Sequence, residues 1–102
     1  MGVDARWEDE QGTALETLED GNNFVAQLLP TGADVDFPCL RSVDLYSDTV
    51  FNQLQLPQLI DELRLLDTRQ FDPAVKQHLV SLIRLVHRAS GRVHTYIRLY
   101  GD

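Results

Sequence analysis

The stretch DPAVKQHLVSLIRLVHRASGRVHTYIRLY, residues 72–100, contains a change of hydrophobic period that decides the fold class. From Pro73 to about Ala89 the apolar residues recur at helical spacing, which predicts a long amphipathic helix. Asp72 and Pro73 favour the start of this helix, and Gly91 favours a left-handed C-cap at its end. In residues 92–100, aliphatic residues and a threonine alternate with aromatic and basic residues, which predicts a strand.

The rest of the chain adds shorter elements to this helix and strand. They are expected as strands at residues 3–8, 13–19 and 39–45 and as helices at residues 24–29 and 57–66. No linker divides the chain, so residues 1–102 are expected to form one domain. The predicted fold class is α+β, with a small antiparallel or mixed sheet of 3–4 strands and two or three helices packed on one face.

Charge is distributed unevenly along the sequence. The net charge is −7, but residues 1–62 hold 13 acids and two basic residues, whereas residues 63–102 hold three acids and seven basic residues. The two halves either present an acidic and a basic face or neutralise each other, within one fold or across a homodimer. The negative sum argues against binding of nucleic acid or of an anionic membrane, which requires a dominant basic surface.

Cysteine content and the N-terminal sequence bear on the cellular compartment. Cys39 is the single cysteine, so no internal disulfide can form and a reducing compartment is favoured. The sequence MGVDARWEDE lacks the apolar segment of a signal peptide. A cytoplasmic location is therefore expected.

The segment DLYSDTVFN, residues 44–52, is rich in side-chain oxygen and invites a test as a ligand site. Its acids do not follow the calcium-loop spacing, and it lacks the glycines of a phosphate-binding loop. Asp44 and Asp48 could share acid and base roles in hydrolysis. The preferred interpretation is a turn from strand to helix, in which Ser47 or Asp48 caps the helix and Phe51 enters the core.

The histidines and Cys39 do not match a metal-binding pattern. His78 and His87 lie nine positions apart on the predicted helix and face opposite ways, and Cys39 has no CxxC partner. A Cys39–His nucleophile pair stays open as an alternative to a buried cysteine in a strand. No metal or cofactor is expected.

The polar side of the last predicted strand is a candidate binding face. His94, Tyr96, Arg98 and Tyr100 alternate with Val93, Thr95, Ile97 and Leu99, so they form one row. Tyr and Arg are frequent anchors in protein interfaces. The alternative is the solvated face of an antiparallel sheet, and the sequence leaves both interpretations open.

Two segments carry a resemblance to other proteins. LRSVDLYSDTVFNQLQLPQLIDEL, residues 40–63, and VHTYIRLYGD, residues 93–102, resemble short uncharacterised bacterial proteins with an IDxYGDTVFNxxQ-like segment, although Ser47 stands where that pattern has Gly. In size, acidity and layout the chain is also similar to immunity proteins of bacterial toxin systems. That similarity implies a small inhibitor that sequesters a toxin.

We therefore expect a soluble, non-enzymatic protein-binding domain, in its most concrete form an acidic immunity-type inhibitor that covers a basic toxin or nuclease. Two alternatives stay open: a ligand-binding or hydrolytic domain that uses Asp44 and Asp48 with His94 and Tyr96, and a homodimeric structural module. The residues expected to take part in binding are Glu8, Asp9, Asp34, Asp36, Asp44, Asp48, His94, Tyr96, Arg98 and Tyr100.

Overall fold

The computed structural model describes residues 2–30 and 35–101, which form four strands and four helices. In chain order these elements are β1 (Asp4–Asp9), β2 (Ala14–Leu18), α1 (Phe24–Leu28), α2 (Pro38–Arg41), β3 (Asp48–Phe51), α3 (Leu56–Leu66), α4 (Pro73–Ser90) and β4 (Thr95–Tyr100). The strands form one antiparallel sheet in the order β2-β1-β4-β3. The predicted α+β class is confirmed, and the sheet is antiparallel rather than mixed.

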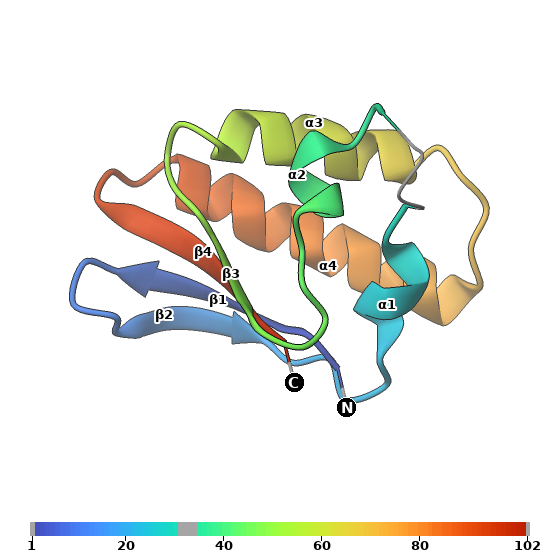
Figure 1. Ribbon diagram of the computed structural model, residues 1–102, viewed down its shortest axis with the longest axis horizontal. Coiled ribbons are helices and arrows are strands. Elements are labelled where there is room, and N and C mark those ends of the chain that lie inside the picture. The colour runs from blue at the N-terminus through green and yellow to red at the C-terminus, as the bar shows by residue number, and fades with distance from the viewer. Residues whose placement is uncertain (1, 31–34, 102) are drawn as a thin grey trace.

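The helices lie together on one side of the sheet (Figure 1). Helix α4 packs on β1, β2 and β4, while α1 rests on α4 and α2 rests on α3. The side of α4 that faces this core is apolar, and its buried residues are Val75, Leu79, Leu82, Leu85, Val86 and Ala89. From β4, Ile97 and Leu99 point into the same core. Among the described residues, no helix covers the opposite face of the sheet.

The expected strand at residues 39–45 is wrong. Pro38–Arg41 forms the short helix α2, and the third strand follows it at Asp48–Phe51. Glu62 on α3 explains the helix, because its buried carboxylate accepts hydrogen bonds from the backbone N–H groups of Cys39 and Leu40 at 3.0 and 2.9 Å. A contact across 22 residues therefore decides a local conformation that the apolar run alone assigns to a strand.

The segment DLYSDTVFN is also placed differently from the prediction. Asp48–Phe51 is strand β3, so neither Ser47 nor Asp48 caps a helix. Phe51 does enter the core, as expected, and Val50 lies on the other face. The turn into α3 begins at Asn52, whose side-chain oxygen accepts hydrogen bonds from the N–H groups of Leu54 and Gln55.

Helix α4 begins and ends close to the predicted positions, but its caps differ. Asp72 occupies the N-cap without a side-chain hydrogen bond to the helix. Gly91 has φ −86°, so the left-handed C-cap predicted there is wrong. The left-handed conformation instead falls on His94, with φ 60°, and β4 begins only at Thr95. Val93 is consequently exposed and does not join the inward row of the strand.

Candidate binding face of the sheet

The uncovered side of the sheet carries a continuous set of polar and aromatic side chains, which we call the open face. Strand register gives its membership, because directly paired residues of an antiparallel sheet point to the same side. Arg6 pairs with Arg98, Glu8 pairs with Tyr96, and Asp48 pairs with Tyr100. The open face therefore includes Asp4, Arg6 and Glu8 on β1, Thr17 on β2, Tyr96, Arg98 and Tyr100 on β4, and Asp48 and Val50 on β3.

Glu8 is the centre of this face and is only 2% exposed, although no described helix covers it. Arg98 donates from Nε to Oε1 at 3.0 Å, and the Tyr100 hydroxyl donates to Oε2. Arg6 adds a third contact, 3.7 Å from Nη1 to Oε2. A buried carboxylate is costly unless it is paired and hydrogen-bonded, and these three side chains offset the cost of placing Glu8 on the sheet.

The same contacts fix the protonation of the donors. Burial and the hydrogen bond to Glu8 raise the pKa of Tyr100 above its ordinary value, so its hydroxyl stays protonated at neutral pH. The hydrogen bond to Glu8 likewise raises the pKa of Arg98. Both donors are therefore held in the form that Glu8 requires.

Two arginine side chains lie over the Tyr100 ring at the centre of the open face. The guanidinium carbon of Arg6 lies 4.8 Å from the centroid of the Tyr100 ring, and that of Arg98 lies 5.7 Å from it. Arg98 also reaches Asp48, with 3.8 Å from Nη1 to Oδ2. Like charges in directly opposed positions of a sheet repel, and here the ring and the carboxylates offset the repulsion between Arg6 and Arg98.

The predicted hydrolytic set does not come together. Asp48 is paired with Tyr100 at one end of β4, whereas His94 precedes β4 at the other end. At about 3.4 Å per residue, the six steps between positions 94 and 100 span roughly 20 Å. Asp44 lies at the Asp48 end, where it accepts hydrogen bonds from the Tyr46 N–H and the Ser47 hydroxyl, and these bonds lower its pKa. A stabilised anion in a turn is a poor general acid.

The acids expected to form a binding surface also have separate roles. Asp9 accepts hydrogen bonds from the N–H groups of Gln11 and Thr13 and so closes the β1–β2 turn. Asp36 is exposed in the segment before α2, and Asp34 lies outside the described residues. Glu8 and Asp48 lie on the open face, whereas Asp9 closes a turn, so the described acids of the expected set do not all line one face.

Several acids of the first half instead pair with basic residues of the second half. Arg98 pairs with Glu8 and Asp48, and Arg88 pairs with Glu16. Of the two interpretations of the uneven charge, neutralisation within one fold accounts for these pairs.

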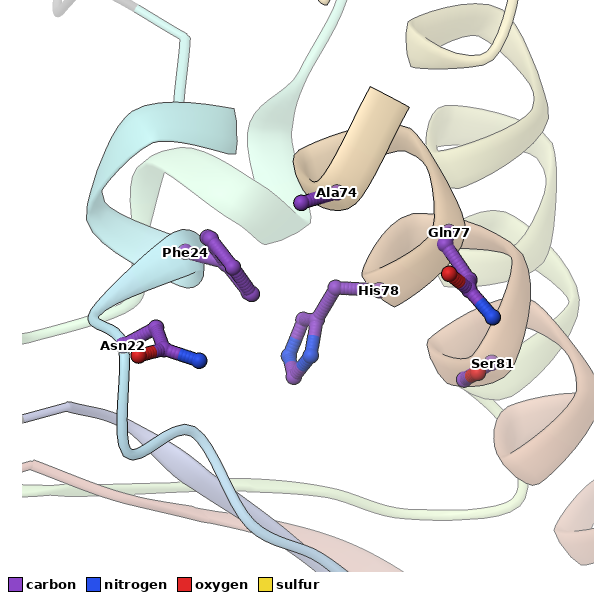
Figure 2. A pocket seen from close by; sticks show the side chains of 6 residues that line it. All are labelled: Asn22, Phe24, Ala74, Gln77, His78 and Ser81. Carbon is purple, nitrogen blue, oxygen red and sulfur yellow. The ribbon is translucent and has the colours of Figure 1, made fainter. Parts of the chain in front are cut away.

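A polar hollow lies on the helix side of the molecule, between α1 and α4 (Figure 2). It measures about 310 Å³ and is lined by Asn22, Phe24, Ala74, Gln77, His78 and Ser81. The His78 ring packs 5.5 Å from the Phe24 ring, and its Nε2 lies 3.8 Å from Oδ1 of Asp20. Asp20 is buried and accepts hydrogen bonds from the N–H groups of Phe24 and Val25, so it holds the start of α1 rather than serving the hollow.

Cys39 does not fit a nucleophile. It lies half-buried on α2 rather than in a strand, and burial beside Glu62 raises its pKa to about 11. The thiol is therefore protonated at neutral pH, while nucleophilic cysteines require the thiolate. Within residues 2–30 and 35–101, no group of three His, Cys, Asp or Glu side chains is placed to hold a metal ion.

Two residues with important contacts in the structure, Arg6 and Gln53, belong to no sequence motif. The alternation of Arg6 with Ala5 and Trp7 predicts that Arg6 points outward. Its position beside Arg98 depends on the register between β1 and β4, which the sequence does not show. Gln53 sits in the turn after β3, where the two hydrogens of its side-chain Nε2 are shared among the backbone carbonyls of Ala89, Arg92 and Thr95. No sequence signal identifies the contacts of Gln53, because they join segments that are far apart in the sequence.

Comparison of the chain with family models, with curated proteins and with solved structures gives no match. None of the helices in the described part of the chain has the length and apolar character needed to cross a membrane. The functional argument therefore rests on the geometry of the open face.

Proposed function

We propose that the chain is a non-enzymatic, cytosolic protein-binding domain that contacts its partner through the open face of the sheet. The observation that carries this proposal is the Glu8 cluster: a buried carboxylate holds Arg98 and Tyr100 in place on a face that no described helix covers. Tyr96 and the partly exposed Val50 extend the face on either side of Arg98. An open face with ordered Tyr and Arg side chains is typical of an interface centre.

Order in these side chains lowers the entropy cost of binding. Immobilising a flexible side chain at an interface costs about 0.5–1.5 kcal/mol. Arg6 and Arg98 already stack on Tyr100 and contact Glu8, so part of this cost is met when the domain folds. A partner can then dock on the face without first ordering it.

Charge favours a basic partner. The net charge of −7 gives the domain a negative field that attracts positively charged proteins. At one end of the open face, Asp4 and Asp48 flank Tyr100 on the neighbouring strands, and Asp44 is exposed in the adjacent turn. This arrangement supports an immunity-type inhibitor of a basic toxin as the concrete form of the proposal.

Site-specific photocrosslinking in the native host tests which face is used. A photoreactive residue at Val50 is on the open face, and one at Gln77 is exposed on α4 on the helix side. We expect a protein adduct from position 50 and none from position 77. Adducts from position 77 alone would contradict the proposal, and adducts of the chain with itself at position 50 would favour the homodimeric module instead.

Affinity measurements with the identified partner then test the mechanism. Arg98→Ala should weaken binding by at least about tenfold, as expected for truncation of an interface anchor. Arg84→Ala, which removes an exposed arginine on α4, is the matched control and should leave the affinity unchanged. The association rate should fall as salt is added, because charge steers the encounter. A rate that does not depend on salt would contradict the basic partner.

A further inference from the structure

The end of the sheet remote from Asp48 presents two strongly exposed apolar side chains. Leu54 is 90% exposed in the turn between β3 and α3, and Val93 is 72% exposed in the turn between α4 and β4. Gln53 joins these two turns, since its Nε2 donates to the carbonyls of Arg92 and Thr95 at 2.8 and 3.1 Å. We call this region, residues 52–54 and 93–96, the turn end.

The turn end contains a strained residue and a second hydrogen bond that closes the turn. His94 has φ 60°, a left-handed backbone that costs a residue with a side chain on the order of 1 kcal/mol. The Thr95 hydroxyl donates to the carbonyl of Arg92 at 2.6 Å, which closes the same turn. Exposed apolar residues on a fixed backbone provide a surface that loses little entropy when a partner covers it.

A hollow lies between the two turns. It has a volume of about 280 Å³ and is lined by Asn52, Gln53, Leu54, His94, Thr95 and Tyr96. Pockets for drug-sized molecules range from about 300 to 1,000 Å³, so this one suits a single side chain better than a cofactor. Tyr96 belongs both to this hollow and to the open face, so a protein docked on that face reaches the hollow directly.

The charge at the rim of the hollow indicates which kind of residue should flank the partner side chain that enters it. His94 lies 3.0 Å from Glu10, measured from Nδ1 to Oε1, and the Glu10 side chain is 51% exposed. Asp9 precedes it at the end of β1. A lysine or arginine beside the inserted residue would therefore meet an accessible carboxylate.

From these contacts we infer that the turn end receives an apolar side chain of the partner protein, flanked in the partner's sequence by a basic residue that pairs with Glu10. The inference rests on the proposed function and adds to it a specific anchor subsite. It gives a role to the exposed Leu54, which lines the hollow, and to Val93, which is exposed next to the lining residue His94.

Titration of short synthetic peptides, followed by backbone amide NMR, tests the subsite directly. The probe is the blocked peptide Gly-Lys-Leu-Lys-Gly, and the two comparison peptides replace its Leu by Ser or both of its Lys by Glu. We expect saturable shifts, confined to the amides of residues 10, 52–54 and 93–96, in the millimolar range. Each comparison peptide should bind at least about tenfold more weakly, because it lacks the apolar or the basic group.

Matched variants separate this inference from the proposed function. Leu54→Ser should abolish the shifts, whereas Tyr46→Ser, at a site that is 81% exposed in another turn, should keep them. Arg84→Ala, at an exposed position on α4, should also keep them. Shifts that survive Leu54→Ser, that spread over the molecule or that are equal for the acidic peptide would overturn the inference. If the peptide titration gives one of these results while position 50 still crosslinks to a partner, the proposed function stands and the anchor subsite does not.

Discussion

Strand β4 sends Ile97 and Leu99 toward the helices and sends Arg98 and Tyr100 toward the open face, and the two sets are held in different ways. On the helix side, packing among apolar side chains supplies the stability, and one shape can often replace another. On the open face, one carboxylate holds its neighbours by directed hydrogen bonds. The comparison teaches that the first face makes the fold stable, whereas the second fixes the positions of particular groups.

The largest expected effect is on the helix side. Ile97 is fully buried, so Ile97→Ala removes apolar contacts and leaves a cavity between the sheet and α4. The free energy of unfolding should fall by about 2–5 kcal/mol. Denaturant titration measures this loss, and a fall below about 1 kcal/mol would show that the core can collapse around the cavity.

Glu8→Gln should have the next largest effect. The substitution keeps the size of the side chain but replaces one carboxylate oxygen by an NH2 group, which cannot accept, so Arg98 or Tyr100 loses its acceptor. We expect a loss of about 1–3 kcal/mol in the free energy of unfolding. Glu10→Gln, at an exposed carboxylate two positions away, is the control and should change it by less than about 0.5 kcal/mol. Equal losses for the two variants would remove the distinction between the open face and ordinary surface.

Alkaline pH should affect the open face selectively. Because the pKa of Tyr100 is raised in the folded chain, the neutral phenol is favoured there. The resulting stabilisation is complete below the ordinary tyrosine pKa of about 10 and is lost as the pH rises through the higher folded value. Unfolding measured from pH 8 to 11.5 should show a fall in stability that is shallower in Tyr100→Phe. Tyr46→Phe should keep the wild-type profile, and identical profiles for all three proteins would refute the assignment.

The smallest effect is expected at Val50, which shares β3 with the buried Phe51 but lies on the open face. Val50→Thr keeps a β-branched side chain, so the free energy of unfolding should change by less than about 0.5 kcal/mol. The same variant should weaken partner binding if the open face is the interface. A large stability loss at this position would mean that the side chain supports the fold itself.

Periodicity within one element was enough to predict much of this molecule. The long helix α4 and the row of Tyr96, Arg98 and Tyr100 follow from spacing along the chain, and the structure has both. The sequence missed α2, because Glu62 on another helix supplies its hydrogen bonds. From the sequence, Glu8 is likewise predicted to be an accessible acid. Its burial depends on which strand lies beside β1, and the sequence does not show this. Contacts between distant segments are what a single sequence does not display.

Sheet order has a consequence for the way the domain folds. The central pair of strands joins β1 to β4, and its register links Asp4 with Tyr100, 96 positions apart. Domains dominated by such distant pairings fold slowly, because a long loop must close before the contacts form. During synthesis the β1–β2 hairpin emerges early and α4 emerges late, and the two halves of the sheet stay separate until residue 100 leaves the ribosome. We expect a nascent chain stalled with residue 91 just emerged to be cut readily by protease, and one with residue 101 emerged to resist.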